Sequence, residues 1–366
     1  MTDAQNQPDA NLQTTPAGAA TMMEIQGYRP PRNQWWDVWD QFKTHKGALF
    51  GLGFFIFALL FVYVGPFIWT LDSQYIDIRA RNTSHILSCF NIGDGWFNTA
   101  SWGAWLSDMP VCFGSPEAFS SANPIYAMKV SWAHPLGADQ LGRDTLARMM
   151  VGGQTSIAVG LIAMLLALFF GTLVGVLAGY FRSVDGPLMR LTDLFLAMPL
   201  LPLLLVIIML FRDSLRNAFG PEGGIFVLIV VVIGLTSWMQ TARVVRGDVL
   251  ALKEREFVLA ARSIGTPPWR LILRHVLPNV MSSIMVSATL GIANAIITES
   301  ALSFLGLGFP SDFPTWGRLL FDATDWLSQN PERVIWPGMF ISLTVLSVNY
   351  IGDGLRDALD PRIRGR

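Results

Sequence analysis

The sequence predicts an all-α integral membrane protein in which six helices cross the bilayer, and three observations indicate this class. Only 14% of the 366 residues are charged and 52% are apolar, whereas about 25% of the residues of soluble domains are charged. Six runs are long and apolar enough to cross about 30 Å of hydrocarbon, which takes about 20 helical residues. Many of the 13 tryptophans fall near the ends of these runs, where amphipathic rings prefer the membrane interface.

The chain before the first run is predicted to be a tail followed by a surface helix. Residues 1–34 are rich in Gln, Asn, Ala, Thr and Pro and lack the apolar core of a signal peptide. We therefore expect a disordered cytoplasmic tail. Trp35, Trp39 and Phe42 then recur at helical spacing, with lysines following. This pattern is typical of a short amphipathic helix on the membrane surface, and the alternative is a simple aromatic and basic anchor for the first span.

The six apolar runs give the order of the expected spans. They lie near 47–70, 155–181, 189–211, 225–242, 280–299 and 334–352. Pro199 and Pro202 interrupt the third run, which a spanning helix tolerates where neighbouring helices shield the freed carbonyls. The second run contains Gly171, Gly175 and Gly179, one helical turn apart. Their spacing predicts a helix face that another backbone approaches closely.

Basic residues predict the orientation of these spans. Lys and Arg are more frequent in the tail, near 182–190, in 243–274 and at the C-terminus than in the segments between, so the positive-inside rule places both termini in the cytoplasm. The expected organisation is a tail over 1–34, an interfacial helix and first span over 35–70, a periplasmic segment over 71–152, a core over 153–352 with a cytoplasmic loop over 243–278, and a cytoplasmic tail over 353–366.

The long outer segment contains both cysteines of the chain, Cys89 and Cys112. A bacterial periplasm oxidises such pairs, and we expect a disulfide between them, with two free buried thiols as the alternative. Closing a loop of this size would stabilise the folded state by about 3 kcal/mol. Farther along the segment, we expect Asp139, Arg143 and Asp144 to cap and pair with neighbouring groups rather than to contact a substrate.

The patterns of common active sites are missing from the sequence. There is no phosphate-binding P-loop, no nucleophile elbow, no zinc-protease motif and no Cys/His cluster with metal-ligand spacing. We therefore expect no catalysis, metal or cofactor on this chain. The net charge of −1 argues against nucleic acid as a partner. The four scattered histidines are interpreted as structural: His45, His85, His134 and His275.

The most specific functional pattern is the stretch EFVLAARSIGTPPWRLILRHVLPN, residues 256–279. An acidic residue opens a helix, apolar residues recur at helical spacing, and a glycine followed by Thr-Pro-Pro ends it. An apolar face flanked by arginines fits a groove of another protein, and a surface helix that touches only lipid headgroups is the alternative. The residues expected to carry the docking are Glu256, Phe257, Ala260, Ala261, Ile264 and Gly265.

Polar residues within the spans are further candidates. Asn294 and Asn349 either line a polar passage or form hydrogen bonds between helices. Ionisable residues at membrane depth are functional candidates by default. Glu299 and Asp193, however, lie near the ends of their spans, so we interpret them as capping or pairing helices.

The docking stretch resembles the EAA loop of ABC importer permeases. The pattern A-A-x-x-x-G, followed by L-P, runs from Ala260 to Pro278 with the family's spacing, although Leu259 stands where the family often has a glutamate. Three other stretches resemble the oligopeptide, dipeptide and nickel branch of that family, in the position of its second permease. They are HPLGADQLGRD from 134, ESALSFLGLGF from 299 and NYIGDGLRDALDPR from 349. The resemblance covers about 134–366, and 35–70 more loosely.

This resemblance implies a type I ABC importer permease, with a core of five helices plus an N-terminal helix. It implies a membrane subunit of an ATP-driven importer of di- and oligopeptides in the bacterial inner membrane. The expected partners are a second homologous permease, two cytoplasmic ATPase subunits that hold ATP and magnesium, a periplasmic substrate-binding protein and membrane lipid. Importers of nickel, oligosaccharide or another small solute share this architecture. A more remote alternative is an ATP-independent secondary transporter, although no internal repeat is visible.

Overall fold

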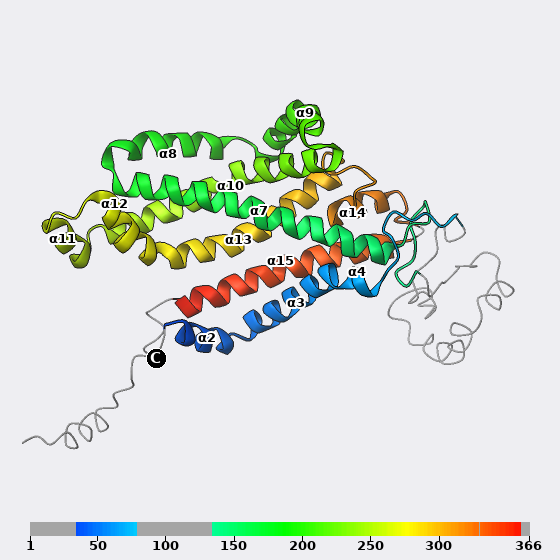
Figure 1. Ribbon diagram of the computed structural model, residues 1–366, viewed down its shortest axis with the longest axis horizontal. Helices are drawn as coiled ribbons and strands as arrows, with labels where there is room; N and C mark the ends of the chain where they lie inside the picture. The colour runs from blue at the N-terminus through cyan, green and yellow to red at the C-terminus, as the bar shows by residue number, and fades with distance from the viewer. Residues whose placement is uncertain (1–33, 79–133, 329, 360–366) are drawn as a thin grey trace, which may run out of the picture.

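The computed structural model describes residues 34–78, 134–328 and 330–359, and its regular elements there are helices, with one isolated antiparallel bridge between Ala138 and Asp144. The predicted all-α membrane fold is confirmed. Five helical segments are long and apolar enough to cross a membrane. They are α3 (Lys46–Tyr63), α7 (Thr145–Tyr180), α10 (Pro221–Leu252), the run Pro268–Phe304 and α15 (Glu332–Leu359). These segments lie side by side along the long axis of the molecule (Figure 1).

Three glycines in the last part of α7 let α10 approach closely. A Cβ added at Gly171, Gly175 or Gly179 would lie 2.7 Å from an atom of α10 in each case, so the predicted glycine face is confirmed. The atoms met advance along α10 in the same order, from Thr241 through Ala242 and its neighbours to Val249. The two helices therefore run parallel, and the chain between them must return to the other end of the bundle.

A bent pair of helices makes this return. α8 (Arg182–Ala197) and α9 (Leu200–Phe219) meet at 90°, with α8 along the bundle and α9 turned across it (Figure 1). The span predicted over 189–211 is therefore broken between Ala197 and Leu200, at the first of the two prolines that interrupt it. Met198 is extended, at φ −79° and ψ 138°, because the ring of Pro199 disfavours helical backbone in the residue before it. The protein has six spans if this bent pair counts as one.

The two described ends of the chain pack together. Val38 and Phe42 of α2 (Gln34–Thr44) are buried in a cluster with Ala48 of α3 and Ala358 of α15. The helix predicted before the first span is thus present, with Val38 and Phe42 on its inward face, while Trp39 stays 41% exposed. The short helices α11 (Glu256–Ser263) and α12 (Pro268–Leu271) lie at this same end, and α4 (Gly65–Ile68) and α14 (Trp316–Thr324) lie at the opposite end (Figure 1).

Two helices extend beyond the spans predicted for them. α7 already begins at Thr145 because the carboxylate of Asp144 caps it, accepting a hydrogen bond from the backbone N–H of Ala147 at 2.9 Å. Residues 145–152 of the predicted outer segment are therefore helical. α15 continues to Leu359, so residues 353–359 of the predicted tail are helical. The expected disulfide between Cys89 and Cys112 lies outside the described residues.

Candidate functional site

The end of α11 is set by its glycine. Gly265 has a φ of +81°, a left-handed conformation that glycine adopts without steric cost. Its N–H donates to the Arg262 carbonyl at 3.0 Å, and the N–H of Thr266 donates to the Ala261 carbonyl at 3.2 Å. The next residue, Pro267, is extended, which turns the chain before α12. The helix end predicted at Gly265 is confirmed.

One side of α11 is anchored in the protein. Val258 and Ala261 are 3% and 8% exposed and share a core with Leu271, Val276 and Val249. These partners belong to α12, the π-helical turn η3 (Ile272–Val276) and α10. From α12 the helical backbone continues through η3 into α13 (Leu277–Phe304). Packed side chains and continuous helical backbone therefore connect α11 to the spanning helix α13.

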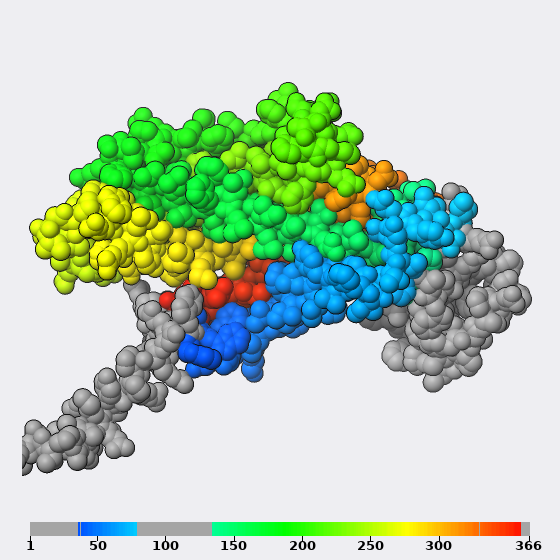
Figure 2. All heavy atoms as spheres, viewed as in Figure 1, coloured from blue at the N-terminus to red at the C-terminus, as the bar shows by residue number. Residues whose placement is uncertain are grey.

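The other side of α11 is apolar and exposed. Phe257, Leu259 and Ile264 are 45%, 41% and 84% exposed, and Ala260 and Glu256 are also exposed. The prediction that Ala261 shares this face is wrong, because Ala261 packs inward beside Val258. Figure 2 shows this region (yellow) projecting at one end of the molecule. An exposed apolar helix held by a buried opposite side is a surface that another protein can cover.

A hollow of about 440 Å³ lies where the bent pair faces α7, α10 and α13. Met198, at the break, lines it, and non-helical backbone at membrane depth is tolerated where it lines a polar cavity. Its polar lining consists of hydroxyl and amide groups, and no lining residue is charged. Three of its apolar residues are methionines. The residues that line it are Met164, Phe195, Leu196, Met198, Leu200, Thr236, Ser237, Met239, Gln240, Thr241, Val244, Ser287, Leu290, Gly291, Asn294 and Thr298.

The structure separates the two asparagines that the sequence singled out. Asn294 lines the hollow, whereas Asn349 is half-buried on α15 and does not line it. The sequence did not single out Gln240 or Ser287. Both are uncharged polar residues inside apolar helices, a feature that could have drawn attention to them.

Glu299 joins three helices. Its side chain is fully buried in α13 and accepts hydrogen bonds from Ser156 Oγ of α7 at 2.9 Å and from Ser303 Oγ at 2.8 Å. The same Ser156 Oγ accepts from the backbone N–H of Trp316 at the start of α14, at 3.2 Å. Asp193, on α8, pairs with Arg243 of α10. Both acids thus pair helices, as expected from the sequence.

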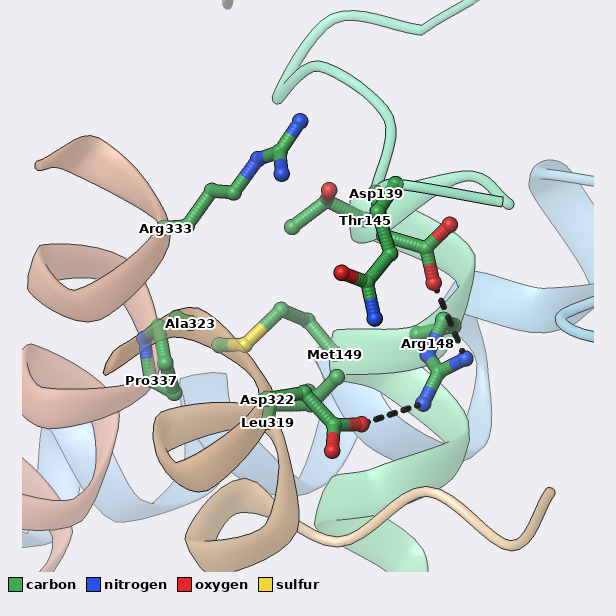
Figure 3. Close-up of a pocket in the computed structure, with 10 residues that line it drawn as sticks. Asp139, Thr145, Arg148, Met149, Leu319, Asp322, Ala323, Arg333 and Pro337 are labelled. Carbon is green, nitrogen blue, oxygen red and sulfur yellow. Dashed lines mark hydrogen bonds and ion pairs between the residues drawn. The ribbon is translucent and has the colours of Figure 1, made fainter. Parts of the chain in front are cut away.

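A network of charges lies at the start of α7, and Figure 3 shows the pairing of Arg148 with Asp139 and Asp322 within it. Asp139 accepts from Arg143 Nε at 2.7 Å and from Arg148 Nη1 at 3.2 Å, and Arg148 Nη2 lies 3.5 Å from Asp322 Oδ2. Asp144, besides capping α7, accepts from Trp69 Nε1 at 2.8 Å. The capping and pairing predicted for Asp139, Arg143 and Asp144 are confirmed, while Arg148 was missed.

This charge network is a structural element and not a substrate site. Its hollow has a volume of only about 30 Å³, about that of one water molecule. Burial raises the pKa of the Asp322 carboxyl above its ordinary value, and the neighbouring Arg318 and Arg148 partly offset that rise. The network fixes the start of α7 against α14.

Comparison with known proteins adds two family matches. Residues 167–365 match the family described as binding-protein-dependent transport system inner membrane component. Residues 33–84 match the family described as N-terminal TM domain of oligopeptide transport permease C.

Individual relatives match over much of the chain. The chain is 31% identical over 369 residues to an oligopeptide transport system permease protein of Haemophilus influenzae, covering 100% of both proteins. It is 38% identical over 250 residues to a dipeptide transport system permease protein of Alkalihalophilus pseudofirmus, covering 68% of this chain and 79% of the relative. It is 39% identical over 248 residues to an oligopeptide transport system permease protein of Bacillus subtilis, covering 67% of this chain and 78% of the relative.

Proposed function

The chain belongs to the family of binding-protein-dependent transport system inner membrane components, and we propose that it forms half of the translocation pathway of an ATP-driven peptide importer. A second, homologous permease completes the pathway, and a binding protein delivers the peptide from outside. The names of its relatives, which are oligopeptide and dipeptide permeases, support peptides as the substrate class.

The chemistry of the uncharged hollow also favours peptides. A peptide backbone carries neutral donors and acceptors, which match hydroxyl and amide side chains such as those of Ser287, Gln240 and Asn294. A passage for nickel calls for imidazole, thiolate or carboxylate groups, and no residue that lines this hollow is His, Cys, Asp or Glu. The methionines add flexible apolar surface that adapts to varied side chains.

The proposal rests on one observation, which is that α11 has one exposed apolar side and one side anchored in the protein. Its apolar side is exposed while Val258 and Ala261 hold it to the core that includes α12, η3 and α10. We propose that a cytoplasmic ATPase subunit, which holds ATP and magnesium, covers this exposed side. Closure of the two ATPase subunits would then push on α11, and the continuous backbone from α12 to α13 would pass the movement to the spans. The chain itself supplies coupling and pathway, and the ATPase subunits supply catalysis.

The turn at Gly265 provides the test. Replacing Gly265 by alanine forces an L-residue into the left-handed region, which costs about 1–2 kcal/mol. A Cβ there meets no atom within 4 Å, so the rest of the fold is undisturbed. A strain of this size changes the ratio of native to non-native turn by a factor of about 5–30. We expect Gly265→Ala to lower peptide uptake by up to about this factor in proteoliposomes that contain the assembled importer.

The matched control is Gly186→Ala. Gly186 lies within α8, its φ is not positive, and a Cβ there also meets nothing within 4 Å. This variant should take up peptide at the wild-type rate. A second variant, Ile264→Glu, places a charge on the exposed side of α11 and should reduce co-purification of the ATPase subunits. Wild-type uptake by Gly265→Ala together with intact co-purification of Ile264→Glu would refute the coupling role of α11. Uptake that continues without ATPase subunits would instead favour a secondary transporter.

A further inference from the structure

A basic hollow lies beside α11 that the proposed coupling does not use. Its volume is about 860 Å³, about twice that of the uncharged hollow. It lies where α7 and α10 end, and α8, α10 and the α11–α12 segment surround it. Four cationic side chains face two carboxylates there, which leaves an excess of two positive charges. These residues are Arg182, Arg246, Lys253, Arg262, Asp185 and Glu254.

Only part of this positive charge is neutralised by the protein. Arg246 is paired with Asp185, with 2.7 Å between Nη2 and Oδ2. Lys253 Nζ donates to the Gly179 carbonyl at 3.0 Å, which leaves two of its three donors. Arg182 and Arg262 have no hydrogen bond or ion pair to any residue in the described part of the chain. They come from α8 and α11, two elements that line the same hollow.

Unpaired arginines that share one hollow favour an anion with several oxygens. Like charges in one site repel, and a bound anion removes that repulsion. The planar fork of a guanidinium matches the oxygens of a phosphate, to which it donates two hydrogen bonds at once. The remaining Lys253 donors add a third point of contact.

The rest of the lining indicates that the phosphate carries apolar groups. Ala178, Leu250, Tyr180 and Phe181 line the same hollow, and the rings of Tyr180 and Phe181 pack edge to face with centroids 5.0 Å apart. Aromatic residues at the end of a spanning helix mark the membrane interface. Basic hollows between spanning helices at the cytoplasmic interface bind anionic headgroups.

We propose that this basic hollow binds the phosphate of an anionic phospholipid of the cytoplasmic leaflet. The headgroup lies between Arg182 and Arg262, with Lys253 beside it, and its glycerol and upper acyl chains contact Tyr180, Phe181 and Leu250. A bound lipid then links the start of α8 to α11. The site binds a phosphate group, and its apolar lining favours a phospholipid as the molecule that carries this group.

Native mass spectrometry of the full-length chain tests this site. The protein, purified with the subunits that accompany it, is transferred from nanodiscs of phosphatidylcholine that contain a minor share of phosphatidylglycerol, and the retained lipid is identified. Each cation near an anionic lipid contributes a factor of about five in affinity, so the double variant Arg182→Gln/Arg262→Gln should retain about 25-fold less phosphatidylglycerol. The control is Arg190→Gln, an exposed arginine of α8 that does not line the hollow, and it should retain phosphatidylglycerol as the wild type does.

The outcomes separate the possible sources of the anion. Selective loss of phosphatidylglycerol in the double variant, with phosphatidylcholine unchanged, supports the proposal. Equal retention by the double variant and the wild type overturns it, and so does an equal loss in the Arg190→Gln control. Displacement of the lipid by millimolar inorganic phosphate would show a small-anion site and overturn the assignment to lipid. If the double variant loses its ATPase subunits while keeping the lipid, the arginines contact a protein and the proposal is wrong.

Discussion

Arg148 shows what burial demands of a single charged residue. It is 1% exposed, and it lies between Asp139 and Asp322, while the Ser311 carbonyl accepts from its Nη2 at 3.2 Å. Removing one member of a buried pair leaves an uncompensated charge, which costs more than the pair contributes. The loss of stability expected on removing Arg148 therefore comes as much from the acids that it neutralises as from the arginine itself.

The first residue-scale prediction follows from that asymmetry. Arg148→Gln should lower the free energy of unfolding by about 3–5 kcal/mol, measured by thermal unfolding of the purified chain. The control is Lys43→Gln, which removes an exposed ion pair with Asp40, 3.3 Å long, and should change stability by less than about 1 kcal/mol. Equal shifts in the two variants would show that Arg148 is not the centre of a buried network.

Local spacing explains which of these residues the sequence could predict. Asp144 and Asp139 precede a helix, where carboxylates commonly cap and pair, and their roles were predicted from that position. Arg148 is paired with Asp322, which lies far along the chain on α14. No local pattern encodes that pairing, because it exists only once α7 and α14 are packed.

At the scale of elements, the close contact of α7 with α10 depends on glycines of α7, which have no side chain. At Gly175 an added Cβ would lie 2.7 Å from the Ala242 carbonyl oxygen and 2.8 Å from Val245 Cβ. Backbone atoms cannot move aside as a flexible side chain can, so the two helices would have to separate. The glycines therefore fix the distance between these two spans.

Gly175→Ala should destabilise the protein by about 1–3 kcal/mol, the usual cost of overpacking. The matched control is Gly53→Ala in α3, another spanning helix, where an added Cβ meets nothing within 4 Å. That variant should be neutral or slightly stabilising, because alanine is the better helix former. Thermal unfolding of both variants in the same detergent distinguishes the outcomes, and an unchanged melting temperature for Gly175→Ala would contradict the close packing.

Hydropathy predicted that these helices exist, but it predicted less well where they break and which side of each is buried. Pro199 and Pro202 marked an interruption of the apolar run over 189–211, but they did not predict the 90° angle between α8 and α9. On α11, apolar residues occupy both the anchored and the exposed side, so spacing alone could not assign Ala261 to the inward side. In both cases the decision depends on neighbouring helices that are distant in the sequence.

At the scale of the whole molecule, the number of crossings follows from how the helices pack. Five crossings would leave the two ends of the chain on opposite faces of the membrane. Yet Phe42 of α2 and Ala358 of α15 share one buried cluster, and α7 and α10 run parallel. The bent pair of α8 and α9 must therefore supply a return across the membrane, which makes the count even.

This even number of crossings determines which parts of the protein lie on the same side of the membrane. Chemical labelling of cysteines from outside the cell tests which side that is. Ser263, at the end of α11, is exposed, and Leu327, just beyond α14, is 54% exposed at the other end. In a chain whose Cys89 and Cys112 are replaced by serine, Leu327→Cys should react with a membrane-impermeant maleimide in intact spheroplasts. Ser263→Cys should react only after the membrane is permeabilised, because the proposed docking of an ATPase subunit on α11 requires the cytoplasmic side, and the positive-inside rule favours that side for the basic residues near α11. The reverse pattern would place α11 outside, beyond the reach of any ATPase, and the coupling role proposed for it would fall with the orientation.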